Sequence, residues 1–309
     1  MYRFIKIWLQ LALRFYIKNI KIQGAAIKQI SRPTLLAVNH SNSFLDALIV
    51  TAYYPNEIHF LARGDAFNKK WAAWILKNLL NIIPIHRLEE GRENLIKNTE
   101  SFEEVMQVLA DGGSVLIFPE GLCKNENTIR PLRKGAARMA YQAWQQYNIH
   151  ELNIQPISIR YATFTDAPKT INLFLGQALT RKDFTIEQEA VFYNKFNVVL
   201  RDRLQVENIV DFHSTTSSTY LKILMALPAL LGYLIHRPFY ILLRNFIRKK
   251  TKGTVFYDSV LFGSMMLIYP FFVLLITGIA VLISGNNSAF WFLLLLLPQT
   301  AWCYKIYRK

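Results

Sequence analysis

Residues 34–46 read Thr-Leu-Leu-Ala-Val-Asn-His-Ser-Asn-Ser-Phe-Leu-Asp, and three patterns meet in this short stretch. The apolar run 34–38 predicts a buried strand, the polar run 39–43 predicts a tight turn, and the apolar pattern from Phe44 predicts a helix. His40 and Asp46 therefore flank one turn between a strand and a helix. A histidine that a carboxylate orients is a common general base, so this pair is the first candidate for catalysis.

Two structural interpretations compete with the catalytic one. Ser43-x-x-Asp46 fits a capping box, in which Ser43 is the N-cap of the helix and Asp46 reaches back to the backbone. His40 can equally be a polar residue of the turn without a chemical role. The sequence around residue 40 leaves these interpretations open.

Short strand patterns alternate with amphipathic helix patterns between residues 24 and 212. The expected strands cover residues 34–39, 58–61, 81–86, 114–118, 154–160 and 170–175, and the expected helices cover 43–53, 70–80, 94–110, 136–147 and 185–206. Repeated β-α-β units predict an α/β fold with a mixed, largely parallel sheet flanked by helices. Functional side chains in such folds gather on the loops that follow the strands.

The excess positive charge of the chain, +15 over 309 residues, lies at its two ends. Residues 1–30 contain six Lys or Arg and no Asp or Glu. Residues 221–309 contain ten Lys or Arg and one acidic residue, whereas residues 31–220 contain twenty basic and twenty acidic residues. Basic residues mixed with large apolar ones favour an anionic membrane surface, so we expect membrane phospholipids as partners and no nucleic acid. The two cysteines lie in different regions and indicate neither a disulfide framework nor a metal site.

Three domains are expected from these patterns. Residues 1–23 predict an amphipathic helix at the membrane interface, with an ordinary helix packed on the domain as the alternative. Residues 24–212 contain the alternating strands and helices. Residues 213–309 predict a membrane-associated region, in which a polar linker at 213–219 precedes an interrupted apolar segment at 221–246 and a transmembrane hairpin at about 259–284 and 289–304.

The carboxy-terminal segments differ in how well they suit a bilayer. His236-Arg237-Pro238 divides the 221–246 segment into halves too short to cross, so we expect a shallow or re-entrant element there. The hairpin has basic residues outside both ends and none in its polar turn at 285–288. The positive-inside rule then puts the folded domain on the cytoplasmic side. A buried helical hairpin in a soluble protein is the alternative.

Three further motifs carry groups that can bind an anion or a hydroxyl. Ile83-Pro-Ile-His-Arg87 places Arg87 after a strand, where a guanidinium can bind phosphate. Phe118-Pro-Glu-Gly121 places Glu120 at a strand end, and Gly121 allows close approach of a ligand or a positive φ. Arg130-Pro-Leu-Arg-Lys-Gly-Ala136 puts Arg133 and Lys134 just before a helix, where they can face an anion. The structural alternatives are a surface ion pair for Arg87, a plain turn for Glu120 and Gly121, and a solvated start of a helix for Arg133 and Lys134.

The order of these motifs resembles the glycerolipid acyltransferase family, the 1-acyl-glycerol-3-phosphate acyltransferases and their relatives. The four blocks of that family are matched by Asn39-His40 with Asp46, by Ile83-Pro-Ile-His-Arg87, by Phe118-Pro-Glu-Gly121 with Leu132-Arg-Lys-Gly-Ala136, and by Ile154-Gln-Pro-Ile-Ser-Ile159. The resemblance covers about residues 30–210. The chain departs from the family at two points, because His40 and Asp46 are one residue further apart than usual and Leu122 stands where Thr or Ser is common.

The resemblance implies a membrane-bound O-acyltransferase of phospholipid biosynthesis. Its acceptor would be lysophosphatidic acid or a related precursor, glycerol 3-phosphate or a lyso-aminolipid. Its donor would be acyl-CoA or an acyl carrier protein, with no metal and no other cofactor. His40 would be the general base and Asp46 its partner, and the substrate would be bound by Asn39, Arg87, Glu120, Gly121, Arg133 and Lys134. Two other classes stay open: a lipid hydrolase or transacylase with Ser41, Ser43 or Cys123 as nucleophile, and a non-catalytic lipid-binding membrane protein.

Overall fold

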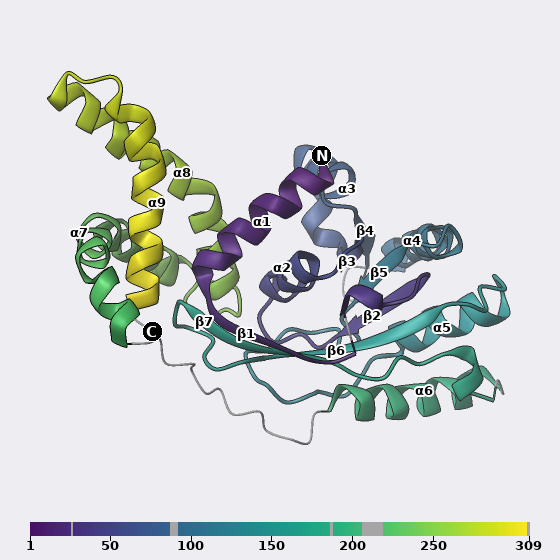
Figure 1. Ribbon diagram of the computed structural model, residues 1–309. Helices are drawn as coiled ribbons and strands as arrows, with labels where there is room; N and C mark the ends of the chain where they lie inside the picture. The colour runs from purple at the N-terminus through teal and green to yellow at the C-terminus, as the bar shows by residue number, and fades with distance from the viewer. Residues whose placement is uncertain (26, 87–91, 186–187, 206–218, 308–309) are drawn as a thin grey trace. The chain divides into compact units, whose positions relative to one another are not determined.

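The computed structural model describes residues 1–309 except 26, 87–91, 186–187, 206–218 and 308–309 (Figure 1). The chain divides into two compact units that are interleaved along the sequence. Unit 1 comprises Met1–Ile7, Lys21–Arg160 and Asn172–Val210, and unit 2 comprises Trp8–Ile20, Tyr161–Ile171 and Asp211–Lys309. The division into domains 1–23, 24–212 and 213–309 stays a prediction.

Within the described residues, a seven-stranded sheet has the order β1-β7-β6-β2-β5-β3-β4. The central strand β2 (Thr34–Val38) is parallel to both of its neighbours, β6 (Asn153–Tyr161) and β5 (Ser114–Ile117). β3 (His59–Arg63) is parallel to β5 and to β4 (Ile82–Ile85), and β1 (Ile17–Gly24) and β7 (Lys169–Leu175) complete the sheet. The predicted α/β fold with a mixed, largely parallel sheet is confirmed.

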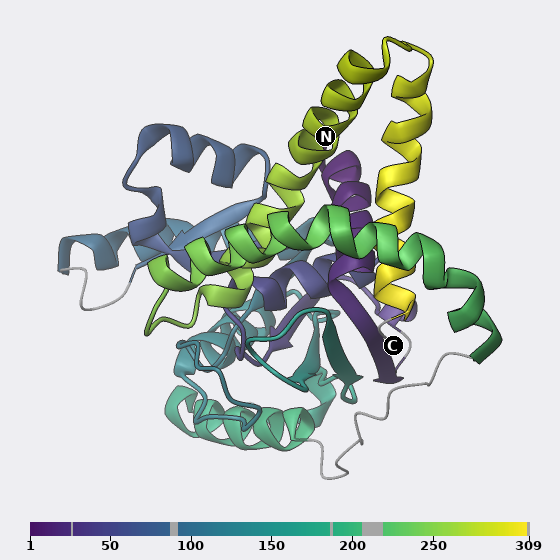
Figure 2. The ribbon, with the colours of Figure 1, turned by 90° about the vertical axis from the view of Figure 1, so that its left-hand side faces the viewer.

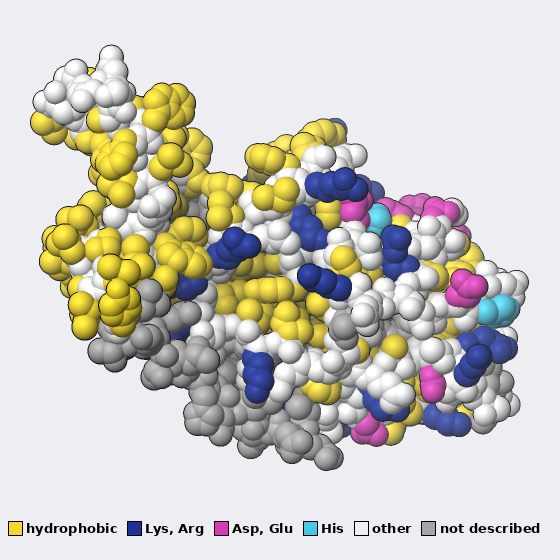
Figure 3. All heavy atoms as spheres, in the orientation of Figure 1, with side chains coloured by type: hydrophobic (Ala, Val, Ile, Leu, Met, Phe, Trp, Pro, Cys, Tyr) yellow, Lys and Arg dark blue, Asp and Glu magenta, His cyan; other side chains and the backbone are white. Residues whose placement is uncertain are grey.

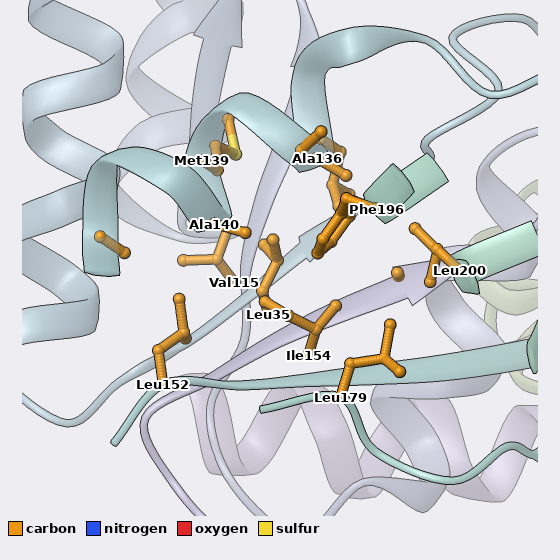
Figure 4. Close-up of a cluster of buried hydrophobic side chains, with 14 of the residues drawn as sticks. Leu35, Val115, Ala136, Met139, Ala140, Leu152, Ile154, Leu179, Phe196 and Leu200 are labelled. Atoms are coloured by element: carbon orange, nitrogen blue, oxygen red, sulfur yellow. The ribbon is translucent and has the colours of Figure 1, made fainter. Parts of the chain in front are cut away.

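Helices cover both faces of this sheet, which explains why β2 is buried at every position instead of alternating between buried and exposed residues. Figure 1 shows α6 (Glu189–Leu204) on one face and α2 (Phe44–Tyr53) on the other. Side chains of β2, β5 and β6 meet those of α5 (Lys134–Gln145) and α6 in one buried cluster, which includes Leu35, Val115, Ile154, Ala140 and Phe196 (Figure 4). This core fixes the strands whose carboxyl ends carry the candidate functional groups.

The amino-terminal helix is shorter than the predicted 1–23. α1 covers Tyr2–Tyr16, and the next residues form strand β1 instead of continuing the helix. β1 contains three isoleucines, which are β-branched and lose side-chain freedom in a helix. Pairing with the sheet therefore outweighs the helical spacing of the apolar residues. An interfacial position for α1 stays a prediction.

Helix α7 (Thr219–Lys250) is continuous through Pro228 and Pro238, so the expected division of the 221–246 segment at His236-Arg237-Pro238 is wrong. A shallow or re-entrant position of this segment stays a prediction. A proline removes one helical hydrogen bond, and packing against a neighbouring helix can compensate for this loss. α9 (Ala289–Tyr307) is such a neighbour. Gly232 lets the two helices approach closely, because a Cβ there would lie 2.1 Å from the Thr300 carbonyl oxygen.

Three helices of the described chain are long and apolar enough to cross a membrane: α7, α8 (Tyr257–Ser284) and α9. α8 and α9 correspond to the hairpin expected at 259–284 and 289–304. The expected linker at 213–219 lies outside the described residues, except for its last residue, with which α7 begins.

Unit 2 contains a buried polar cluster. The Lys169 ammonium lies 2.8 Å from the Asp258 carboxylate, and the Tyr16 hydroxyl donates a hydrogen bond to the same carboxylate. All three side chains are buried. The cluster joins the last residue of α1, the first residue of β7 and the beginning of α8, so it connects the three sequence segments of this unit.

Candidate active site

His40 and Asp46 are in direct contact at the carboxyl end of β2. The Nδ1 atom of His40 lies 3.0 Å from Oδ2 of Asp46, and the side chains are 18% and 0% exposed. The same Asp46 oxygen accepts a hydrogen bond of 2.8 Å from the Asn42 N–H. The pair therefore forms despite the additional residue between its members, and the carboxylate is held in place by the turn itself.

The additional residue is accommodated by a strained turn. Ser43 has a φ of +52° and is the N-cap of α2, but its side chain makes no capping hydrogen bond. The capping-box interpretation of Ser43 and Asp46 is therefore wrong. The Ser43 N–H donates instead to Sγ of Cys123, at 3.0 Å, and the Asn125 side chain donates to the Ser41 carbonyl, at 2.9 Å. The segment after Gly121 thus supports the widened turn.

The sequence did not identify Cys123 and Asn125 as residues that support this turn. The longer spacing of His40 and Asp46 was the one local sign that a non-standard turn needs support. The supporting residues lie about eighty positions away, and no short-range pattern predicts such a contact.

Phe118 fixes the plane of the His40 ring. The two rings stack with centroids 3.8 Å apart and an angle of 16° between their planes. With Nδ1 held by Asp46, the other ring nitrogen, Nε2, makes no hydrogen bond to any residue in the described part of the chain. An oriented imidazole with an available Nε2 can accept a proton from a bound hydroxyl.

Glu120 supports the same histidine from the end of β5. Its carboxylate is buried and accepts a hydrogen bond of 3.0 Å from the His40 N–H. Burial raises the pKa of the Glu120 carboxyl, whereas hydrogen bonds from the His40 and Arg130 backbones lower it. Because the pKa stays above its ordinary value, the protein stabilises the carboxylate less well than water does.

Replacing Glu120 by glutamine should raise the unfolding temperature at pH 7.5 by about 1–3 °C, the shift that roughly 1 kcal/mol gives. Glutamine keeps an oxygen for the His40 N–H and removes the buried charge. A carboxyl with a raised folded-state pKa binds protons more tightly when folded, so the stability of the wild type falls as pH rises from the ordinary pKa of 4.5 to the raised value. The difference in unfolding temperature between the variant and the wild type should therefore nearly vanish at pH 4, where Glu120 is mostly protonated in the folded protein. Thermal unfolding in detergent at both pH values tests this, and a lower unfolding temperature of the variant at pH 7.5 would show that the charge is stabilising.

Gly121, Arg133 and Lys134 form one side of the site. Gly121 has a φ of +70°, one of the two roles that the sequence left open for it, and a Cβ there would lie 3.0 Å from Cγ of Arg133. The Arg133 N–H donates to the Pro119 carbonyl at 2.7 Å, which fixes the start of α5 beside the loop. Both basic side chains are exposed at this point, where an anionic group of a substrate can reach them.

Asn39 and Arg87 complete the predicted set. Asn39 is buried, and its amide exchanges hydrogen bonds of 3.0 and 2.6 Å with the Ile159 backbone and donates to Ser41. This amide joins β2 to β6, so we place Asn39 among the groups that hold the turn. Arg87 lies outside the described residues. Within the described residues, no group of three or more His, Cys, Asp or Glu side chains is placed to hold a metal ion.

Part of the chain is similar to known acyltransferases. Residues 19–160 match the family model described as Acyltransferase. The chain is similar to the probable 1-acyl-sn-glycerol-3-phosphate acyltransferase of Mycoplasma pneumoniae, with 28% identity over 46% of this chain and 53% of that protein. The protein of the same description from Mycoplasma genitalium is 23% identical over 71% of this chain and 77% of its own. The lyso-ornithine lipid O-acyltransferase of Brucella abortus is 23% identical over 42% of this chain and 45% of its own. The chain thus spans about half the length of the first and third relatives.

Proposed function

We propose, from the premise that the chain carries an acyltransferase domain in residues 19–160, that it transfers a fatty acyl group from a thioester to a hydroxyl of a glycerolipid precursor. The observation that carries this proposal is the His40–Asp46 pair, with Nδ1 held at 3.0 Å and Nε2 available. The acceptor that we favour is lysophosphatidic acid, because two of the similar proteins are described as acting on it.

The proposed reaction needs only a base and a positioned substrate. The acceptor hydroxyl gives its proton to Nε2 of His40 while its oxygen attacks the thioester carbonyl carbon. The carbon–sulfur bond then breaks, and the leaving thiolate takes the proton back from the imidazolium. Asp46 stabilises the imidazolium and fixes the tautomer. General-base assistance of this kind contributes a factor of about 10²–10⁴ in rate.

The basic residues beside the loop are proposed to bind the acceptor phosphate. Arg133 and Lys134 lie next to Gly121 at the start of α5, and the resemblance adds Arg87 to this group. Glu120 holds the His40 backbone in position rather than contacting the substrate. Thioester acyl transfer by this route uses acyl-CoA or an acyl carrier protein as donor, and we propose no metal or redox cofactor for it.

A covalent mechanism through a protein nucleophile is less well supported. Burial raises the pKa of Cys123 to about 12, so its thiol is protonated at neutral pH and is a weak nucleophile. The side chains of Ser41 and Ser43 are both buried. Direct attack by the substrate hydroxyl therefore fits the site better than an acyl-enzyme does.

Membrane association is proposed for the whole chain. α7, α8 and α9 have the length and composition of membrane spans, and the charges flanking α8 and α9 favour a cytoplasmic position of the acyltransferase domain. A water-soluble donor and a lipid acceptor would then meet at the membrane surface. We propose no nucleic-acid partner.

An acceptor panel tests this function directly. The purified chain in lipid nanodiscs should transfer label from acyl-CoA or acyl carrier protein to lysophosphatidic acid. A lyso-ornithine lipid, which is the substrate in the description of one similar protein, and glycerol 3-phosphate are the alternative acceptors. The Arg133→Ala/Lys134→Ala variant should lose activity with a phosphate-bearing acceptor and keep it with a lyso-ornithine lipid. Transfer to none of the three from either donor would contradict the proposal.

A further inference from the structure

Helix α3 (Lys70–Asn78) exposes two tryptophans on one face of unit 1. Trp71 and Trp74 are 67% and 59% exposed, and their spacing of three residues puts them on neighbouring turns of the same side. Neither indole N–H has a hydrogen-bond partner among the residues that the structure describes. Trp144, in contrast, is buried and donates to the Leu152 carbonyl. Two large exposed indoles side by side on one helix form an apolar surface of the kind that marks an interaction site.

Three exposed lysines accompany these tryptophans. Lys70 and Lys77 belong to α3, Lys69 immediately precedes it, and none of the three forms an ion pair within the described part of the chain. The nearest acid in sequence, Asp65, is already paired with Arg63. Tryptophan and lysine together are typical of elements at the headgroup level of a bilayer, where the indole has an apolar face and a polar N–H and lysine binds anionic lipid.

The topology places the beginning of α3 at the edge of the sheet that carries the site. β3 is parallel to β5 and β4, so its carboxyl end lies at the same edge as the residues that follow β5 and β2. A short helical turn, Gly64–Phe67, leads from β3 to α3, and Gly64 lies against the ring of His86, which follows β4. A surface at α3 is therefore next to the strand ends that bear Glu120 and His40.

A second exposed apolar segment of unit 1 lies on the same side of the sheet. Phe4 and Ile7 are exposed, while Tyr2 and Lys6 attach this segment to Ile58 and to the Tyr54 carbonyl. Figures 1 and 2 show the amino end of the chain and α3 on the side of the sheet away from α6. Hydrophobic side chains lie there beside Lys and Arg, with Asp and Glu side chains next to them (Figure 3).

We propose that the surface of α3 and the residue before it, formed by Trp71, Trp74 and the three lysines, binds the headgroup region of an anionic bilayer. This contact, which rests on the membrane association proposed above, brings the His40 edge of the sheet to the surface where a lipid acceptor resides. It is separate from the candidate spans α7, α8 and α9 and is made by the unit that carries the site itself.

Photo-crosslinking in the full chain tests this surface without measuring activity. The protein with p-benzoylphenylalanine at position 74 is reconstituted in phosphatidylglycerol vesicles that contain a tritiated lipid. The matched control carries the probe at Val198, which is 62% exposed on α6, and the positive control carries it at Phe271 in α8. Position 74 should label lipid well above position 198. Labelling no higher than at position 198, or crosslinks from position 74 to protein alone, would overturn the proposal.

Lysine substitutions separate a bilayer contact from accidental proximity. Lys77→Glu should lower lipid labelling from position 74 by about fivefold or more, because one basic residue near an anionic surface is worth about that factor. Lys77→Glu should not change lipid labelling from the probe at position 271. In vesicles of phosphatidylcholine, which carries no net charge, lipid labelling from position 74 should fall by the same factor without the Lys77→Glu substitution. Unchanged labelling in both cases would overturn the role of charge. Since no substrate is present, a chain without acyltransferase activity still yields a clear result.

Discussion

Replacing His40 by alanine should lower the rate of acyl transfer by a factor of about 10²–10⁴. The variant keeps the sheet and the loops and removes the group that accepts the hydroxyl proton. Asp46 stays hydrogen-bonded to the Asn42 N–H, so its carboxylate is not left without a donor. The initial rate with a labelled thioester and lysophosphatidic acid, together with thermal unfolding of the same preparation, measures both effects.

A second variant keeps this prediction testable if alanine disturbs the turn. In His40→Asn the side-chain amide can still donate to Asp46, but it cannot act as a base near neutral pH. This variant should be as stable as the wild type and as inactive as the alanine variant. His150→Ala, which changes an exposed histidine of the same unit, is the matched control and should keep full activity. Retention of more than about a tenth of the wild-type rate by both His40 variants would remove the general base from the mechanism.

The fold was predictable because its strands are buried on both faces and therefore carry continuous apolar runs. Runs such as 34–38 and 114–118 are visible in any window of sequence, and the strands that they predicted are present in the sheet. The boundary between α1 and β1 was missed because pairing with the sheet, a long-range effect, outweighs the local helical spacing. Pro238 misled for a related reason, since packing against a neighbouring helix such as α9 can compensate for the hydrogen bond that a proline removes.

The chemical groups of the site were predictable by type but their arrangement was not. Asp46 reaches His40 only because Ser43 adopts a positive φ, and residue type alone rarely predicts that conformation for serine. The ring of Phe118 and the thiol of Cys123 come from another strand and its loop. Their contribution depends on how β2 and β5 are paired, which becomes visible only when the sheet is assembled.

Asp258→Asn should destabilise the protein by about 3–5 kcal/mol, because it leaves the Lys169 ammonium buried without its counter-ion. Burial lowers the pKa of Lys169, and the negative charge of Asp258 is what opposes this effect. The pair Arg63–Asp65 is the control, since both of its side chains are exposed. Asp65→Asn should cost less than about 1 kcal/mol, as is usual for a surface pair.

Removing the whole cluster should be far less costly than removing one member. In Tyr16→Phe/Lys169→Met/Asp258→Leu, no buried charge or hydroxyl is left without a partner, so most of the lost stability should return. Unfolding of the wild type, the single variants and the triple variant in one detergent gives the coupling between the three side chains. If the triple variant is as unstable as the sum of the single losses, the cluster is not a coupled unit. If it regains stability, the large effect of the single variant comes from the cost of burying one unpaired charge, and this cost is what keeps Lys169 and Asp258 together in unit 2.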